Sequence, residues 1–135
     1  MADLVIGATG VAKGPGAFTD ERNTSLIVFQ GRAMYLKDDG TLGLCDASTE
    51  AKAKAWGLTL NSAAGGQPVR VIRSGQVDLG VALAAGEPYV ISSTLAQGFL
   101  MPASDLGSGD WTTLVGVAVD AQYLDVHIAH GGQVP

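Results

Sequence analysis

Two stretches of this chain look like copies of one β unit, and that repetition constrains the fold more than any other feature. In the first copy, two runs of β-branched and aliphatic residues, 56–61 and 68–77, flank a connection of small and polar residues. The same order returns over 115–120 and 124–134. Two apolar runs around a Gly-rich connection are the pattern of two antiparallel strands and their loop. The sequence therefore predicts a chain that uses one β-hairpin twice.

Glycine spacing extends the repeat beyond the hairpins. Three pairs of matched glycines are separated by similar intervals of 55, 59 and 57 residues: Gly31 with Gly86, Gly57 with Gly116, and Gly75 with Gly132. Similar intervals over several elements indicate an internal duplication rather than a chance match of glycine-rich sequence. We therefore predict pseudo-repeats over about residues 26–77 and 81–134.

The remaining sequence predicts short strands joined by tight turns. Glycine occurs 19 times, and charged residues make up only 16% of the chain. Strands are predicted at 25–30, 31–36, 41–45, 56–60, 69–73, 76–83, 86–91, 98–102, 115–119 and 124–129. The helix-compatible segment 46–55 lacks an apolar stripe, so we expect a surface loop with a helical turn. The fold class is all-β, a small β-barrel or a jelly-roll-like sandwich built from two similar four-strand units. The strand order stays open.

Residues 1–24 are predicted to form an extended N-terminal arm, and residues 25–135 a single β domain. The arm carries separated large apolar residues, and a Gly-Pro-Gly break at 14–16 opposes a helix. We expect it to build little core of its own. Its apolar residues would then add an edge strand or pack on a neighbouring subunit; they are Leu4, Val5, Ile6 and Phe18.

The run Leu4–Gly10 invites comparison with the strand and Gly-rich turn that open a dinucleotide-binding fold. That motif needs a third glycine at a fixed spacing and a helix directly after the turn. Here Lys13 takes the glycine position, and the break at 14–16 follows at once. We do not predict a nucleotide site.

Composition excludes several classes of protein. The net charge is −5, and the eight Lys and Arg residues are scattered rather than clustered, so we do not expect a nucleic acid partner. The single cysteine cannot form a disulfide within the chain. No apolar run approaches the roughly 18 residues that a membrane span needs, so we expect no membrane partner and synthesis in a cytoplasm.

The residues with reactive side chains are few. Asp125 and His127 share one face of a predicted strand, while His130 points to the other. Zinc needs three or four convergent ligands, so we expect no metal and no cofactor. Cys45 has apolar neighbours and is interpreted as a small core residue. We expect that replacing His127, His130 or Cys45 with Ala leaves function intact.

The acidic residues fall in turns, where Asp is favoured because it bonds nearby backbone amides. The chain has too few aromatic residues for the sugar-binding cleft that paired catalytic carboxylates would need. Trp56 and Trp111 occupy matching places, each shortly before a glycine-led strand, and are interpreted as core or interface anchors.

The signature Gly-Leu-x-Leu-Asn…Gly-Gln-Pro-Val-x-Val, over residues 57–71, resembles the small capsid decoration or cement proteins of tailed bacteriophages. The resemblance extends over about residues 26–134. It implies a β-rich structural protein without enzymatic activity. It also implies a homo-oligomer, dimer or trimer, that binds the major capsid protein on the outside of the virion and stabilises the head.

On this hypothesis the expected capsid or subunit contacts are Leu4, Val5, Ile6, Phe18, Trp56 and Trp111. The alternative hypothesis, from a different class, is a small β-barrel enzyme or ligand-binding module that uses Asp125, His127 and Cys45.

Overall fold

The computed structural model describes Leu4, Ile6 and residues 11–92 and 98–134. Within this part the chain is almost entirely β, which confirms the predicted fold class. The strands are β1 (Ala12–Lys13), β2 (Phe18–Asn23), β3 (Ala33–Leu36), β4 (Leu42–Leu44), β5 (Ala55–Thr59), β6 (Pro68–Asp78), β7 (Pro88–Ile91), β8 (Leu100–Pro102), β9 (Trp111–Ala118) and β10 (Tyr123–Gln133). One helical turn, α1 (Glu50–Ala53), and one 3-10 turn, η1 (Ala103–Asp105), complete the elements, so the expected helical turn within 46–55 is confirmed.

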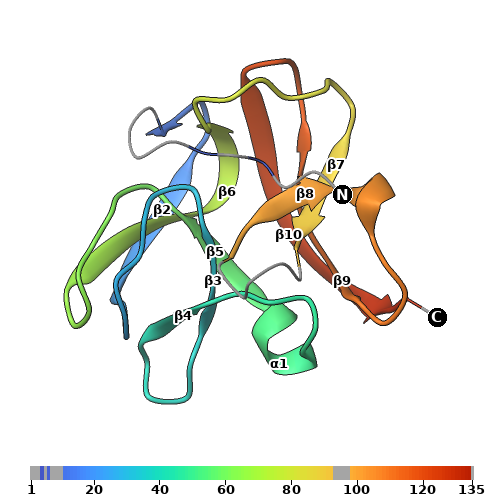
Figure 1. Cartoon of the computed structure of the whole chain (residues 1–135). Coiled ribbons are helices and arrows are strands. Elements are labelled where there is room, and N and C mark those ends of the chain that lie inside the picture. The colour runs from blue at the N-terminus through green and yellow to red at the C-terminus, as the bar shows by residue number, and fades with distance from the viewer. Residues whose placement is uncertain (1–3, 5, 7–10, 93–97, 135) are drawn as a thin grey trace.

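The strands form one curled antiparallel sheet that closes about half of a barrel (Figure 1). Along the sheet the order is β4-β3-β5-β6-β10-β9-β7-β8, and β1 and β2 also pair with β6. An Asp-Gly hairpin joins β3 to β4, with Gly40 at a φ of +85°. Curling brings the two ends of the sheet toward one another around a shared interior.

The strand order contains the predicted duplication. In the first unit the order from the edge inward is β4-β3-β5-β6, and in the second it is β8-β7-β9-β10. Each unit therefore has the same order of four strands, and the two meet where β6 pairs with β10. The prediction of two similar four-strand units is confirmed at the level of topology.

Equivalent backbone hydrogen bonds show that the repeat extends to single residues. The N–H of Gly31 donates to the carbonyl of Thr59 at 2.8 Å, and the N–H of Gly86 donates to the carbonyl of Ala118 at 2.7 Å. Both glycines have a positive φ, +76° and +82°, which residues with side chains disfavour. Gly31 and Gly86 are therefore a backbone requirement of their units.

The two tryptophans do not occupy matching places, so that prediction is wrong. Gly57 and Gly116 are equivalent, because they pair with the same position of β3 and β7 beside a register shift. The residue before Gly57 is Trp56, but the residue before Gly116 is Val115. Trp111 lies at the start of β9, five residues before Gly116. Both tryptophans precede a glycine of the repeat, but by one residue in the first unit and by five in the second.

The main core fills the inside of the curled sheet with residues from both units. Its fully buried members include Leu58, Ile72, Leu79, Ile91, Leu100 and Leu124. A second, smaller cluster lies within the first unit and contains Val28, Met34, Leu42, Val69 and Val71. The helical turn α1 is held to the second unit, since the hydroxyl of Thr113 donates to the carbonyl of Ala53.

Two predicted strands are wrong. Residues 25–30 form no strand, because the segment makes an isolated bridge from Val28 to Ala63 rather than a ladder. Residues 76–83 stay in the sheet only to Asp78, as the end of β6. The Asp78 carboxylate accepts a hydrogen bond from the N–H of Gly80, whose φ of +73° turns the chain out of the sheet.

The N-terminal segment packs on its own domain. The N–H of Leu4 donates to the carbonyl of Leu100 at 2.8 Å, and Leu4 and Ile6 are half-buried against the main core. From Phe18, β2 pairs with β6 along its whole length, so the segment does add a strand. Val5 lies outside the described residues. The expectation that Leu4 and Ile6 build little core is therefore wrong.

Gly75 tests whether the N-terminal segment is part of the fold. It has a φ of +94°, and a Cβ there would overlap the carbonyl oxygen of Gly16. We expect Gly75→Ala to lower the free energy of unfolding by about 1–2 kcal/mol through backbone strain and by a further ~1–3 kcal/mol through overlap. Denaturant titration measures both. Gly66→Ala is the matched control, because Gly66 has a φ of +82° and a Cβ there would meet no atom within 4 Å. Equal losses for the two variants would contradict the packing.

Candidate functional site

The residues of the alternative enzyme hypothesis lie in different surroundings. Cys45 is fully buried in the main core. Burial, and then the negative charge of Asp46, raise the pKa of the Cys45 thiol. Asp125 and His127 lie on the exposed face of β10, and His130 is exposed nearer its end. No group of three or more His, Cys, Asp or Glu residues within the described ranges could hold a metal ion. The buried thiol of Cys45 is therefore not an accessible nucleophile beside the histidines.

The thiol of Cys45 provides a chemical test of this burial. A disulfide reagent reacts only with an ionised thiol that it can reach. The raised pKa keeps the Cys45 thiol protonated, and burial covers its sulfur. We expect no labelling of the native protein by such a reagent at pH 8, and one thiol labelled per chain in denaturant. Absorbance of the released aromatic thiol measures it. Rapid labelling of the native protein would return Cys45 to the candidates for catalysis.

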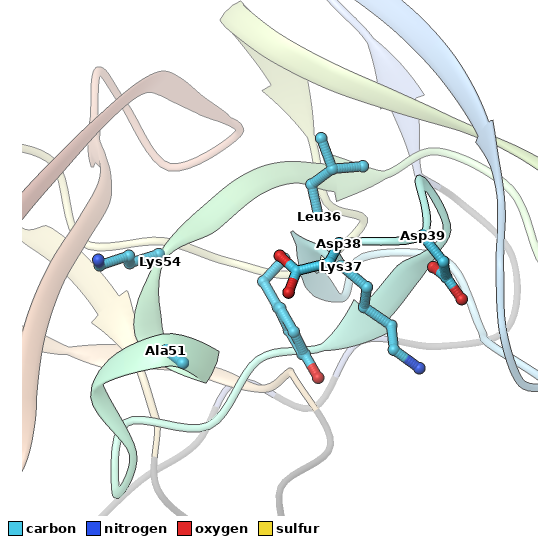
Figure 2. A pocket seen from close by; sticks show the side chains of 7 residues that line it. Leu36, Lys37, Asp38, Asp39, Ala51 and Lys54 are labelled. Atoms are coloured by element: carbon cyan, nitrogen blue, oxygen red, sulfur yellow. The ribbon is translucent and has the colours of Figure 1, made fainter.

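A shallow cleft of about 590 Å³ opens between the β3–β4 hairpin and α1 (Figure 2). Its lining is Tyr35, Leu36, Lys37, Asp38, Asp39, Ala51 and Lys54. Asp39 accepts hydrogen bonds from the hydroxyl and the N–H of Thr41, which hold its pKa below the ordinary value. Its carboxylate therefore stabilises the turn. The lining carries two lysines and two aspartates, whose charges balance, so we assign the cleft no chemistry.

Trp56 lies in a cluster of aromatic and charged side chains in the first unit. The guanidinium of Arg73 lies 4.1 Å from the centre of the indole, and that of Arg22 lies 5.0 Å from it. These residues come from β5, β6 and β2, three neighbouring strands. The ring also packs against the smaller core cluster. Cation–π contacts of this kind attract a cation to the indole face and fix both groups.

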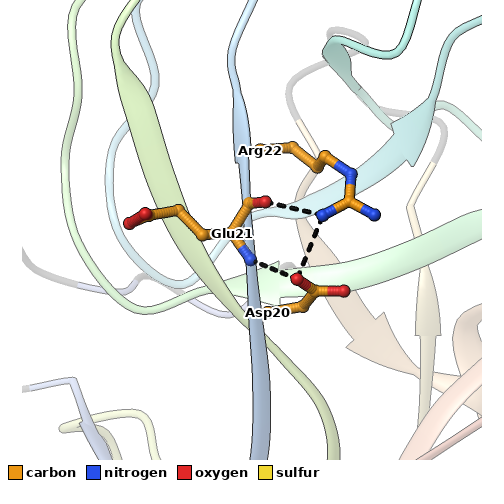
Figure 3. Close-up of polar contacts among 3 residues, drawn as sticks. All are labelled: Asp20, Glu21 and Arg22. Atoms are coloured by element: carbon orange, nitrogen blue, oxygen red, sulfur yellow. Dashed lines mark hydrogen bonds and ion pairs between the residues drawn. The ribbon is translucent and has the colours of Figure 1, made fainter.

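Asp20 holds Arg22 in this position (Figure 3). Its carboxylate lies 3.0 Å from the Arg22 guanidinium, which also donates to the carbonyl of Glu21 at 2.8 Å. The backbone N–H of Glu21 holds the pKa of Asp20 below its ordinary value, and the charges of Arg22 and Arg73 add to this effect. Asp20 therefore stays ionised and keeps one arginine fixed beside Trp56.

The other predicted contact residues differ in exposure. Phe18 is 61% exposed at the start of β2. Trp111 is half-buried, and its backbone N–H donates to the carbonyl of Ala47 at 2.7 Å. Leu4 and Ile6 are half-buried on the core. Phe18 and the two tryptophans therefore offer surface to a partner, whereas Leu4 and Ile6 serve the domain itself.

Sequence reasoning missed an exposed apolar segment, formed by Leu26, Ile27 and Phe29. These side chains are 38%, 61% and 47% exposed. The sequence predicts a strand over residues 25–30 and does not show which of its apolar side chains are exposed. Because the segment joins no ladder, only Val28 turns inward, and the residues on either side of it face solvent.

A scan against models of known protein families found no match, and a search of curated proteins found no similar protein. Among the described residues there is no helix with the length and apolar character to cross a membrane.

Proposed function

We propose that this chain is a structural decoration protein, which binds the major capsid protein on the outer surface of a phage head and stabilises contacts between capsid subunits. The observation that carries the proposal is the Trp56 cluster, a partly exposed indole held between Arg22 and Arg73. The resemblance of residues 57–71 to the cement proteins supplies the identity of the partner.

The Trp56 cluster suits protein binding for two physical reasons. Trp and Arg are enriched among the residues that contribute most to protein–protein affinity. The cluster is also ordered before binding, because the ring rests on the core and Asp20 fixes Arg22. Pre-ordered side chains lose less entropy on association, which leaves more of the contact energy as affinity.

The rest of the molecule is consistent with a structural role. The buried Cys45 and the exposed Asp125 and His127 provide no shared reaction centre. The net charge of −5 suits a protein on the outside of a shell filled with DNA. A decoration protein needs a stable scaffold with contact surfaces, and the duplicated sheet supplies such a scaffold.

Co-sedimentation with purified empty heads tests the proposal. We expect the wild-type chain to pellet with the heads, and the double variant Arg22→Ala/Arg73→Ala to bind about 10- to 30-fold more weakly, or ~1.4–2 kcal/mol. Arg70→Ala is the matched control, since Arg70 is an exposed residue of the same strand as Arg73. It removes one positive charge, where the double variant removes two, and is expected to bind as the wild type does.

The outcomes separate the partner from the contact surface. Wild-type protein that stays in the supernatant at every concentration would reject capsid binding. If the double variant binds heads as strongly as the wild type, the capsid is still the partner, but the Trp56 cluster is not the contact surface. Circular dichroism of each variant verifies that the sheet is retained.

A further inference from the structure

The internal repeat shows which exposed apolar residues the fold does not require. Val28 and Leu83 are equivalent, because both are buried and each donates its N–H to the loop after the matching strand, to Ala63 at 2.9 Å and Ala121 at 3.0 Å. The residues that flank Val28 are Ile27 and Phe29. Those that flank Leu83 are Ala82 and Ala84, and both alanines are exposed.

One unit therefore builds this loop with small side chains at the two exposed positions. Ile27 and Phe29 expose large apolar side chains to water at positions where the second unit has alanine and the same backbone conformation needs nothing larger. Isolated exposed apolar residues need no explanation, but adjacent ones with polar surroundings mark interaction surfaces. We call Leu26, Ile27 and Phe29 the apolar segment.

Three basic side chains lie near the apolar segment. The guanidinium of Arg32 lies 5.9 Å from the ring centre of Phe29 and 4.3 Å from that of Phe99. Lys37 and Lys52 line a small depression together with Leu26. An occupant that buries the segment would therefore need an apolar patch with carboxylates at its rim.

The second unit of the chain presents a patch with that chemistry. Val117, in β9, and Val119, one residue past the end of that strand, are 39% and 52% exposed. Asp125 pairs directly with Val117 across the sheet and is exposed on the same face. Asp120 follows Val119, and the backbone N–H groups of Tyr123 and Gln122 hold its pKa below the ordinary value. We call these four residues the valine face.

The whole chain shares this separation of charge. All eight Lys and Arg residues lie between positions 13 and 73. Residues 74–135 contain six Asp and Glu residues and no Lys or Arg. The two units therefore differ in sign, and the second unit of one molecule attracts the first unit of another.

We infer that copies of this chain associate head to tail, with the apolar segment of one copy on the valine face of the next. The contact joins two different surfaces, so a pair of copies still has one free surface of each kind. Further copies can therefore add until the assembly closes into a ring. Arg32, Lys37 and Lys52 meet Asp120 and Asp125 at its rim, while the apolar side chains meet at its centre. The inference does not depend on capsid binding.

Sedimentation velocity of the full chain over a range of concentrations tests this association. We expect an oligomer that dissociates as salt is raised, because rim charges are screened. Ile27→Ala/Phe29→Ala, which copies the alanines of the second unit, is expected to be monomeric. Val119→Lys/Asp125→Lys, which reverses the rim charge, is also expected to be monomeric. Leu36→Ala is the control, an apolar residue of similar exposure, 41%, outside both surfaces, and is expected to associate as the wild type does.

Mixing the two monomeric variants separates head-to-tail contact from a symmetric dimer. Each variant keeps one intact surface, so a 1:1 mixture is expected to give a heterodimer with a single intact contact and no larger species. A monomeric wild type at all concentrations would overturn the inference. A mixture that stays monomeric while the wild type associates would overturn it as well. Circular dichroism of each variant excludes unfolding as the cause.

Discussion

The strand β6 changes its neighbour between Ile72 and Ser74, and both halves of the molecule depend on that change. Along one edge β6 pairs with β5 at residues 71–72 and then with β10 at residues 74–78, while its other edge pairs with β2 and β1. Gly75 lies next to this point, and its φ of +94° and missing side chain let the N-terminal segment pass beside it. One long strand thereby joins the N-terminal segment to both units. The sheet curls around the core that the two units share.

Comparison of the two units distinguishes residues that the fold requires from residues that it tolerates. Gly31 and Gly86 keep the same positive φ in both units, since a side chain would strain that turn. In contrast, Ile27 and Phe29 have alanine at the matching positions. A residue that both copies retain serves the backbone or the core. A large exposed residue in one copy alone is a candidate for contact with another molecule.

The consecutive strands β5 and β6 and the distant strand β2 assemble the Trp56 cluster. β5 provides the indole, and β2 and β6 provide the arginines on neighbouring strands. The N-terminal segment thus has two roles, as a strand of the sheet and as the source of Arg22 and Asp20. Its removal is expected to affect stability and binding together. That coupling makes single-residue variants more informative than truncation.

The sequence by itself determined the all-β class, the repeated hairpins and the turns, because glycine conformation and the alternation of apolar residues are local properties. The sequence also contains the separation of charge between the two units. The basic residues are spread over positions 13–73, so they do not stand out as one cluster. Tertiary structure alone decided the half-burial of Leu4 and Ile6, the exposure of Ile27 and Phe29, and the arginines around Trp56. Each of these depends on which strands become neighbours, and that choice rests on contacts between residues distant in the chain.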